Sequence, residues 1–170
     1  SLPIILDTSS LGNQFEYSVY HTLSEDIIGS VKFLAQTVNG LEGEDTRLSS
    51  RLFIPANRLR GFNTRKVGPK DGENYVGGNY VSTLSIEAAL PNLLPESSRT
   101  DISAFMDSGN VWHVDYDSTI DDTNKIRTAV GLAANVWTPV GPLSFVLAQD
   151  LTKSINDETQ AFNFRIGTSF

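Results

Sequence analysis

Residues that could carry catalysis or bind a metal are few and scattered in this chain. There is no cysteine, which excludes disulfides and thiolate metal sites. The two histidines, His21 and His113, are far apart in the sequence, so a histidine-based metal site is not expected. No Ser/His/Asp spacing typical of a nucleophilic enzyme stands out. We therefore expect no enzyme, no metal and no cofactor.

Composition narrows the class of protein. Twenty acidic residues against 13 basic ones give a net charge of −7, which argues against nucleic acid as a partner because phosphate binding needs a basic surface. No apolar run approaches the roughly 18 residues of a membrane helix. Hydrophobic content of 39% and a mean hydropathy of −0.16 look like a soluble domain. However, strands of a membrane barrel conceal their apolar face by alternation.

The last nine residues show such alternation. Every second position is Phe162, Phe164, Ile166, Thr168 or Phe170, and polar or small residues fill the positions between them. Since side chains alternate between the two faces of a strand, one face is apolar and the other polar. Taken alone, the pattern fits an edge strand of a soluble sheet and a transmembrane strand about equally. A terminal aromatic side chain would suit the membrane interface.

The same alternation recurs along the chain and predicts about eight antiparallel strands. Most segments are near the roughly 9–11 residues that a tilted strand needs to cross a bilayer. The predicted strands cover residues 14–21, 27–38, 47–54, 80–90, 100–112, 126–137, 143–149 and 161–170.

Charged residues of these segments fall on one predicted face, and the opposite face carries none. That face is solvent in a soluble β-sandwich and lumen in a membrane barrel, where a basic residue facing lipid at mid-bilayer would cost about 2–4 kcal/mol. The charged residues are Glu16, Lys32, Arg47, Arg51, Glu87, Asp107, Arg127 and Arg165. Aromatic residues near strand ends, where interfacial girdles form, are Tyr17, Trp112, Trp137 and Phe170.

The predicted connections differ in length between the two ends of the strands. Residues 55–79, 113–125 and 150–160 form long polar connections, whereas 138–142 is a tight Pro/Gly turn. Outer-membrane barrels have long external loops and short periplasmic turns. The asymmetry is imperfect, because residues 22–26, a short connection, fall on the long-loop end.

Five blocks, in order, resemble the Omp85 superfamily of outer-membrane proteins. Arg60-Gly61-Phe62 within a long loop resembles the hallmark of the family's sixth external loop. The others are residues 68–80, which resemble the continuation of that loop, residues 105–112, residues 138–143 and residues 160–170. Together the blocks cover roughly residues 47–170, and five matches in order are more specific than any one of them.

The resemblance implies a fold, a place and a role. The family barrel has sixteen strands behind periplasmic POTRA domains. This chain would then be a single all-β domain over residues 1–170, the C-terminal half of a transmembrane antiparallel β-barrel, without POTRA domains, in the bacterial outer membrane. Because lipid does not tolerate unpaired strand edges, such a half-barrel would close alone or pair with a second copy. Partners would be the lipid bilayer, outer-membrane client proteins and assembly-complex lipoproteins.

The resemblance also implies site residues. Arg60 of the loop motif would fold into the lumen and be held by Glu87 and Asp107, with Gly61 allowing a tight backbone and Phe62 packing in the lumen. A guanidinium has the donors to engage two carboxylates, and both acids lie on the predicted lumen face. We interpret them as a structural clamp rather than an acid/base pair.

The last strand would be the working element of the family's lateral gate and the protein's own C-terminal β-signal. Its residues are Phe162, Phe164, Ile166, Gly167 and Phe170, with Gly167 at the point where the family's strand kinks. The implied function is folding and inserting β-barrel proteins. The alternatives are a small eight-stranded barrel that acts as an anchor or adhesin, and a soluble β-sandwich binding domain.

Overall fold

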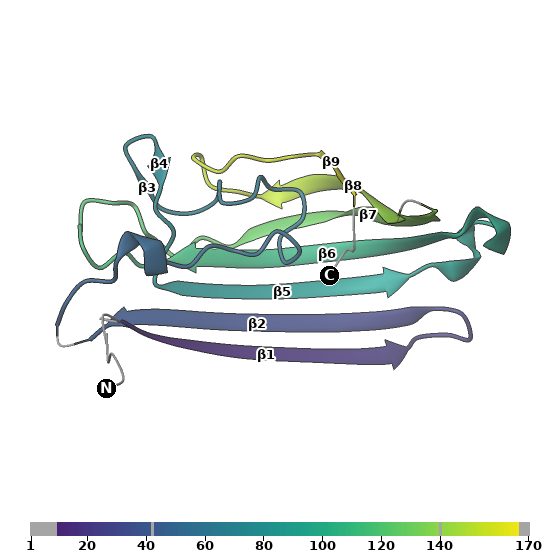
Figure 1. Cartoon of the computed structure of the whole chain (residues 1–170), viewed down its shortest axis with the longest axis horizontal. Coiled ribbons are helices and arrows are strands. Elements are labelled where there is room, and N and C mark those ends of the chain that lie inside the picture. Colours follow the sequence, from purple (N-terminus) through teal and green to yellow (C-terminus); the bar gives the residue numbers. More distant parts are fainter. Residues whose placement is uncertain (1–9, 42, 140, 167–170) are drawn as a thin grey trace, which may run out of the picture.

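A computed structural model describes residues 10–41, 43–139 and 141–166 of the chain (Figure 1). Seven strands form the main sheet: β1 (Ser10–Thr22), β2 (Ile28–Gly40), β5 (Tyr80–Ala89), β6 (Thr100–Trp112), β7 (Arg127–Thr138), β8 (Gly141–Thr152) and β9 (Phe162–Ile166). Strands β3 (Lys70–Asp71) and β4 (Asn74–Tyr75) form a separate small hairpin. Single-turn 3₁₀ helices cover Leu48–Ser50 (η1), Pro91–Leu93 (η2) and Glu96–Ser98 (η3).

The main sheet is an antiparallel meander in which each strand pairs with its neighbour along the chain. The order is β1-β2-β5-β6-β7-β8-β9, which confirms the all-β antiparallel prediction and is one curved sheet rather than the two of a sandwich. Within the described residues, β1 and β9 are the two edges and are not paired with each other. No helix in this part of the chain is long and apolar enough to cross a membrane.

The predicted strand over residues 47–54 was wrong. The segment contains η1 and then a single bridge between Leu52 and Gly78. Strand β2 therefore pairs directly with β5, and the main sheet has seven strands, not eight, within the described residues. Alternation in this segment does not separate buried from exposed side chains. Arg51 and Ile54 would lie on opposite faces of a strand, but both are buried. Tertiary contacts of the long loop overrode the local pattern.

Loss of that strand changes which end of the sheet each connection occupies. The connection between β2 and β5 now spans residues 41–79; we call it the inner loop. It lies at the same end as the β6–β7 and β8–β9 connections, while the β1–β2, β5–β6 and β7–β8 turns lie at the opposite end (Figure 1). The short connection over residues 22–26 therefore lies with the other short turns, and its predicted place among the long loops came from counting one strand too many. All the long connections share one end of the sheet.

The two faces of the sheet differ as the alternation predicted. One row of the register aligns Val19, Val31, Ile86, Met106 and Val130 on five successive strands. Apolar side chains on this outer face are exposed, including Phe15, Leu132, Leu147 and Phe162. Such a surface is costly in water and suited to lipid.

The hydrophobic core lies on the other face, beneath the inner loop. Ile54, Leu59, Phe62 and Val67 of the loop pack with side chains of β5, β6 and β7, namely Val81, Val111 and Ala129. A smaller cluster, Val76, Val114 and Ile120, joins the inner loop to the β6–β7 connection. The loop is therefore a packed layer on the inner face of the sheet.

Candidate functional site

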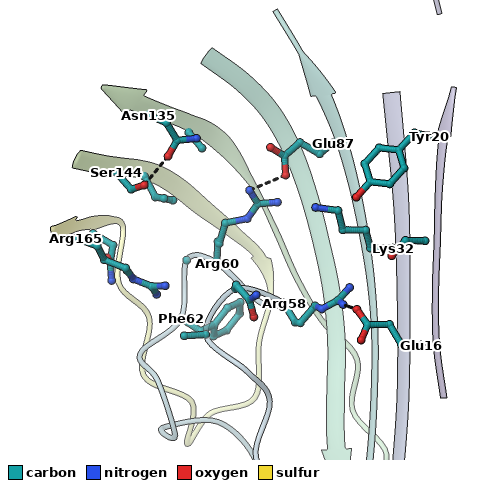
Figure 2. A pocket seen from close by; sticks show the side chains of 17 residues that line it. Glu16, Tyr20, Lys32, Arg58, Arg60, Phe62, Glu87, Asn135, Ser144 and Arg165 are labelled. Atoms are coloured by element: carbon teal, nitrogen blue, oxygen red, sulfur yellow. Dashed lines mark hydrogen bonds and ion pairs between the residues drawn. The ribbon is translucent and has the colours of Figure 1, made fainter. Parts of the chain in front are cut away.

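Arg60 of the inner loop reaches the inner face of β5 and β6. Its Nε and Nη2 donate to the two carboxylate oxygens of Asp107 at 2.8 and 2.9 Å. Its Nη1 donates to Glu87 Oε2 at 3.0 Å, the contact drawn in Figure 2. The Arg60 backbone N–H also donates to Asp107 Oδ2 at 2.9 Å. One guanidinium therefore joins two strands, and Asp107 fixes both the side chain and the backbone of the loop.

The surroundings of Arg60 hold this geometry in place. The Asp107 side chain is fully buried, and the side chains of Arg60 and Glu87 are 14% and 27% exposed. Ser103 donates to the second oxygen of Glu87 at 2.6 Å. The guanidinium carbon lies 3.7 Å from the ring centroid of Phe105, a cation–π contact. Because each carboxylate is occupied by a fixed cation, the arrangement suits a clamp and not proton transfer.

Gly61 and Phe62 complete the loop motif. Gly61 has φ of +91°, and a Cβ there would lie 2.9 Å from that of Ala148 and 3.0 Å from that of Ala129, so a side chain would be both strained and in contact with the sheet. Phe62 is buried in the hydrophobic core. The structure thus brings together Arg60, Glu87 and Asp107, and seats the next two motif residues against β7 and β8.

A cavity of about 530 Å³ lies between the inner loop and the inner face of the sheet. Arg58, which forms an ion pair with Glu16 of β1, and Arg60 both line it, as do Asn135, Ser144 and Arg165 of β7, β8 and β9 (Figure 2). The lining is polar and carries both signs of charge. The charged residues of the strands therefore face an inner space shared with the loop, not the exposed apolar face.

Two further arginine–carboxylate sites were missed at the sequence level. Arg127, at the start of β7, donates from Nε to Asp157 at 2.8 Å, and both side chains are buried. Arg51 pairs with Asp115 of the β6–β7 connection, where Asn79 also donates to Asp115 at 2.8 Å. These residues are separated by 30 and 64 positions, and no spacing rule links them. Their residue types, Arg inside a pattern of apolar and small residues, were the available signal.

The Asp115 site lies outside the strands and is electrostatically tuned. Partial burial opposes its charge, but hydrogen bonds donated by Asn79, Thr46 and Arg51 outweigh that effect and hold the pKa of Asp115 well below its usual range. The backbone N–H of Thr46 supplies one of them, at 2.8 Å. The charged carboxylate therefore ties the start of the inner loop to the β6–β7 connection.

The structure describes the last strand in part. Residues 162–166 pair with Leu143–Leu147 of β8, and Phe162, Phe164 and Ile166 are exposed on the outer face. The ring centroids of Phe164 and Phe145 are 5.0 Å apart. Gly167 and Phe170 lie outside the described residues. Nowhere in the described part of the chain do three or more potential metal ligands cluster.

Comparisons with known proteins agree with this architecture. The chain is 30% identical over 142 residues to the outer membrane protein assembly factor BamA of Neisseria meningitidis serogroup B, covering 66% of this chain and 17% of that protein. It is 29% identical over 140 residues to BamA of Neorickettsia risticii, covering 80% of this chain and 19% of that protein. The chain thus spans less than a fifth of the length of either relative.

A crystal structure of BamA from Haemophilus ducreyi, lacking POTRA domains 1–3, has the same fold. It superposes with a TM-score of 0.76 at 22% identity, over 91% of this chain and 34% of the other. The model of the Omp85 superfamily domain matches residues 6–170. Because this match covers nearly the whole chain, the chain belongs to the Omp85 superfamily.

Proposed function

We propose that this chain is the C-terminal part of the barrel of an outer-membrane protein assembly factor, which folds and inserts β-barrel proteins into the bacterial outer membrane. The observation that carries the proposal is the family match over residues 6–170, joined to two relatives named as BamA assembly factors. The superfamily and these relatives are outer-membrane proteins, and the location of this chain is the outer membrane. The exposed apolar face supports that environment.

The inner loop supports a structural role for the Arg60 motif in this function. Arg60, Glu87 and Asp107 form a clamp that keeps the loop against the wall of the sheet, and Gly61 and Phe62 seat the loop behind it. The hydrophobic core packs the loop on the sheet, and charge-assisted hydrogen bonds of fixed geometry add to this packing by holding the loop in one position. We propose that this clamp keeps the inner loop in place while the edge strands of the sheet open to pair with a client strand.

The working edge in this proposal is β9. Its described residues 162–166 pair with β8. In the described part of the chain no strand pairs with its other edge, whose backbone groups would be available to a client strand by β-augmentation. Phe162, Phe164 and Ile166 would face lipid beside that seam, and Gly167 and Phe170 would complete the β-signal. Clients and assembly-complex lipoproteins are therefore the proposed partners of the full-length protein, which we do not propose to be an enzyme.

The second candidate is a small barrel that anchors or adheres, formed by this chain alone or as a dimer of half-barrels. The exposed apolar outer face fits this candidate as well, but the ordered Arg60 clamp favours the assembly factor, because a passive anchor has no need of a lumen loop fixed by three charged groups. Closure alone and dimerisation both stay predictions. The mass of the protein–detergent complex distinguishes a monomer that closes alone from a dimer. Comparison of boiled and unboiled samples on gels shows whether the barrel is folded.

Reconstitution tests the assembly role. The full-length protein in proteoliposomes is expected to accelerate the folding of an unfolded outer-membrane client, read as a heat-modifiable gel shift. The Arg60→Ala variant should fold clients more slowly, and the chain of 170 residues alone should be inactive. Equal client folding with empty liposomes and with the full-length protein would reject the assembly role and favour the anchor.

A further inference from the structure

The inner loop is hydrogen-bonded through its main chain to the segment that leads into β9. Phe62 and Thr159 form an antiparallel bridge. The N–H of Gln160 donates to Gly61 O at 2.9 Å, and the N–H of Asn63 donates to Glu158 O at 2.9 Å. A further bond runs from the N–H of Glu158 to Lys66 O at 3.0 Å. We call this ladder, residues 61–66 with 158–160, the backbone strap.

The strap ends where the last strand begins. Gln160 precedes β9 by two residues, and Ala161 between them accepts a hydrogen bond from the N–H of Ala148 on β8 at 2.8 Å. The same Ala148 closes the space beside Gly61, where no Cβ fits. The motif residue that follows Arg60 is therefore in contact with β8 at the position where β9 starts to pair.

Asp157, the residue before the strap segment 158–160, anchors that segment through its side chain. Its side chain is fully buried. Its Oδ1 accepts from the N–H of Gly68 at 3.1 Å and from Arg127 Nη2 at 3.2 Å, and its Oδ2 accepts from Arg127 Nε at 2.8 Å and from the N–H of Ser154 at 2.5 Å. One carboxylate thus joins the inner loop, the start of β7 and the β8–β9 connection.

We propose that the inner loop positions the start of β9, through the backbone strap and Asp157, so that the lumen clamp and the edge strand form one mechanical unit. Within the described residues, β9 is an edge strand that pairs only with β8, so its position depends on that one neighbour and on the segment that leads into it. Four hydrogen bonds to Asp157 and three in the strap fix its entry. Withdrawal of Arg60 from the wall would release Gly61, and with it the start of β9.

The consequence for client insertion rests on the proposed assembly function, but the coupling itself can be measured without clients. Hydrogen exchange of the full-length protein in lipid nanodiscs reports the opening of β9. Asp157→Asn leaves Arg127 buried without a full counter-charge and should speed exchange over residues 158–166 at least about tenfold, with β1 and β2 unchanged.

Glu158→Gln is the matched control. Its side chain is 48% exposed and accepts hydrogen bonds from Lys66 Nζ at 3.3 Å and from Asn63 Nδ2 at 3.2 Å. The glutamine oxygen can still accept a hydrogen bond, and the main-chain hydrogen bonds of the strap are kept. Exchange over 158–166 should stay that of the wild type. If Asp157→Asn leaves this exchange unchanged, or raises it equally in β1 and β2, the proposal is overturned.

A second variant should change hydrogen exchange in the opposite direction, because it restrains the strap with a covalent bond. The chain has no cysteine, and Asn63 and Glu158 lie opposite each other in the strap, so Asn63→Cys with Glu158→Cys places a disulfide across it. Oxidation should slow exchange over 160–166 relative to the same reduced protein. No difference between the two states overturns the proposal. A strap effect without client folding in the reconstitution assay would reject the assembly function alone.

Discussion

The outer and inner faces of the same sheet are stabilised by opposite means. The outer face is a continuous register of apolar side chains that remain exposed, such as Val31, Ile86 and Met106. The inner face carries the charged side chains of the strands beside the hydrophobic core, and its key carboxylate, Asp107, is completely buried. The outer face thus depends on its solvent, while the inner face depends on the inner loop that covers it.

The difference teaches where specificity resides in this fold. Apolar contact with lipid is non-directional, so many sequences with the right alternation would satisfy the outer face. The inner side uses charge-assisted hydrogen bonds of fixed geometry, and four arginines there, Arg51, Arg58, Arg60 and Arg127, each have a particular carboxylate partner. On the outer face, a substitution should therefore be tolerated if the new side chain is apolar. On the inner face, it should be tolerated only if the new side chain keeps the hydrogen bonds to its partner.

The largest expected effect comes from breaking the inner face at its most buried group. Asp107→Ala removes three hydrogen bonds from Arg60 and leaves a guanidinium with one partner. We expect the free energy of unfolding to fall by about 3–5 kcal/mol, measured by urea unfolding in lipid vesicles. Trypsin cleavage after Arg60 should become fast. Glu87→Gln, at a more exposed site, should have a smaller effect, and equal stability of Asp107→Ala and wild type would contradict a clamp.

A charge on the outer face should have the next largest effect. Leu147 and Val146 are the central residues of β8, with Leu147 exposed on the outer face and Val146 lining the inner cavity. Leu147→Lys should cost about 2–4 kcal/mol in vesicles because the ammonium faces the bilayer midplane. Val146→Lys, whose ammonium reaches the polar cavity, should cost less. The reverse order in urea unfolding would mean that the two faces have been assigned wrongly.

Gly61 tests how closely the inner loop meets the sheet. Gly61→Ala should cost about 1–3 kcal/mol, because its φ is positive and its new Cβ would contact Ala129 and Ala148. Gly72→Ala is the control, since Gly72 has φ of +56° and no atom within 4 Å of an added Cβ. The Gly72→Ala variant should lose only the stability that depends on the positive φ, because its Cβ contacts nothing. Equal losses in thermal unfolding would show that contact with β7 and β8 does not matter.

The smallest effect is expected from a change of pH at the start of the inner loop, where Asp115 contacts Thr46 and Arg51. The pKa of Asp115 is lower in the folded protein than its unfolded value of about 3.9. Its stabilisation is therefore complete above that value and is lost as the pH falls through the lowered pKa. Hydrogen exchange of residues 46–52 should accelerate between about pH 4 and pH 2, and Asp115→Asn should remove this dependence. Hydrogen exchange of the wild type that does not change with pH would show that Asp115 does not hold residues 46–52 in place.

Much of the fold was predictable because alternation is a local property. The segments that became β6 and β7 read correctly, with Met106 outward and Asp107 inward, since a strand places successive side chains on opposite faces. The same rule failed at residues 47–54. There, Arg51 and Ile54 satisfy different tertiary contacts within a loop, and local alternation has no information about those contacts.

The candidate site divides in the same way. Arg60, Glu87 and Asp107 could be named in advance through a family resemblance, and Glu87 and Asp107 through their face as well. Nothing in the sequence linked Arg127 to Asp157 or Arg51 to Asp115. An ion pair between residues 30 or 64 positions apart depends on how two connections fold over the sheet, which short-range patterns do not encode.

The sequence by itself determined the class of this protein: an antiparallel sheet with an apolar outer face, a charged inner face and a loop motif typical of a family. The tertiary structure alone decided the number of strands, the common end of the long connections, and the union of the inner loop with the entry to β9. The physical reason is range. Alternation acts between residues two apart, whereas the strap and the buried carboxylates exist only once distant segments meet.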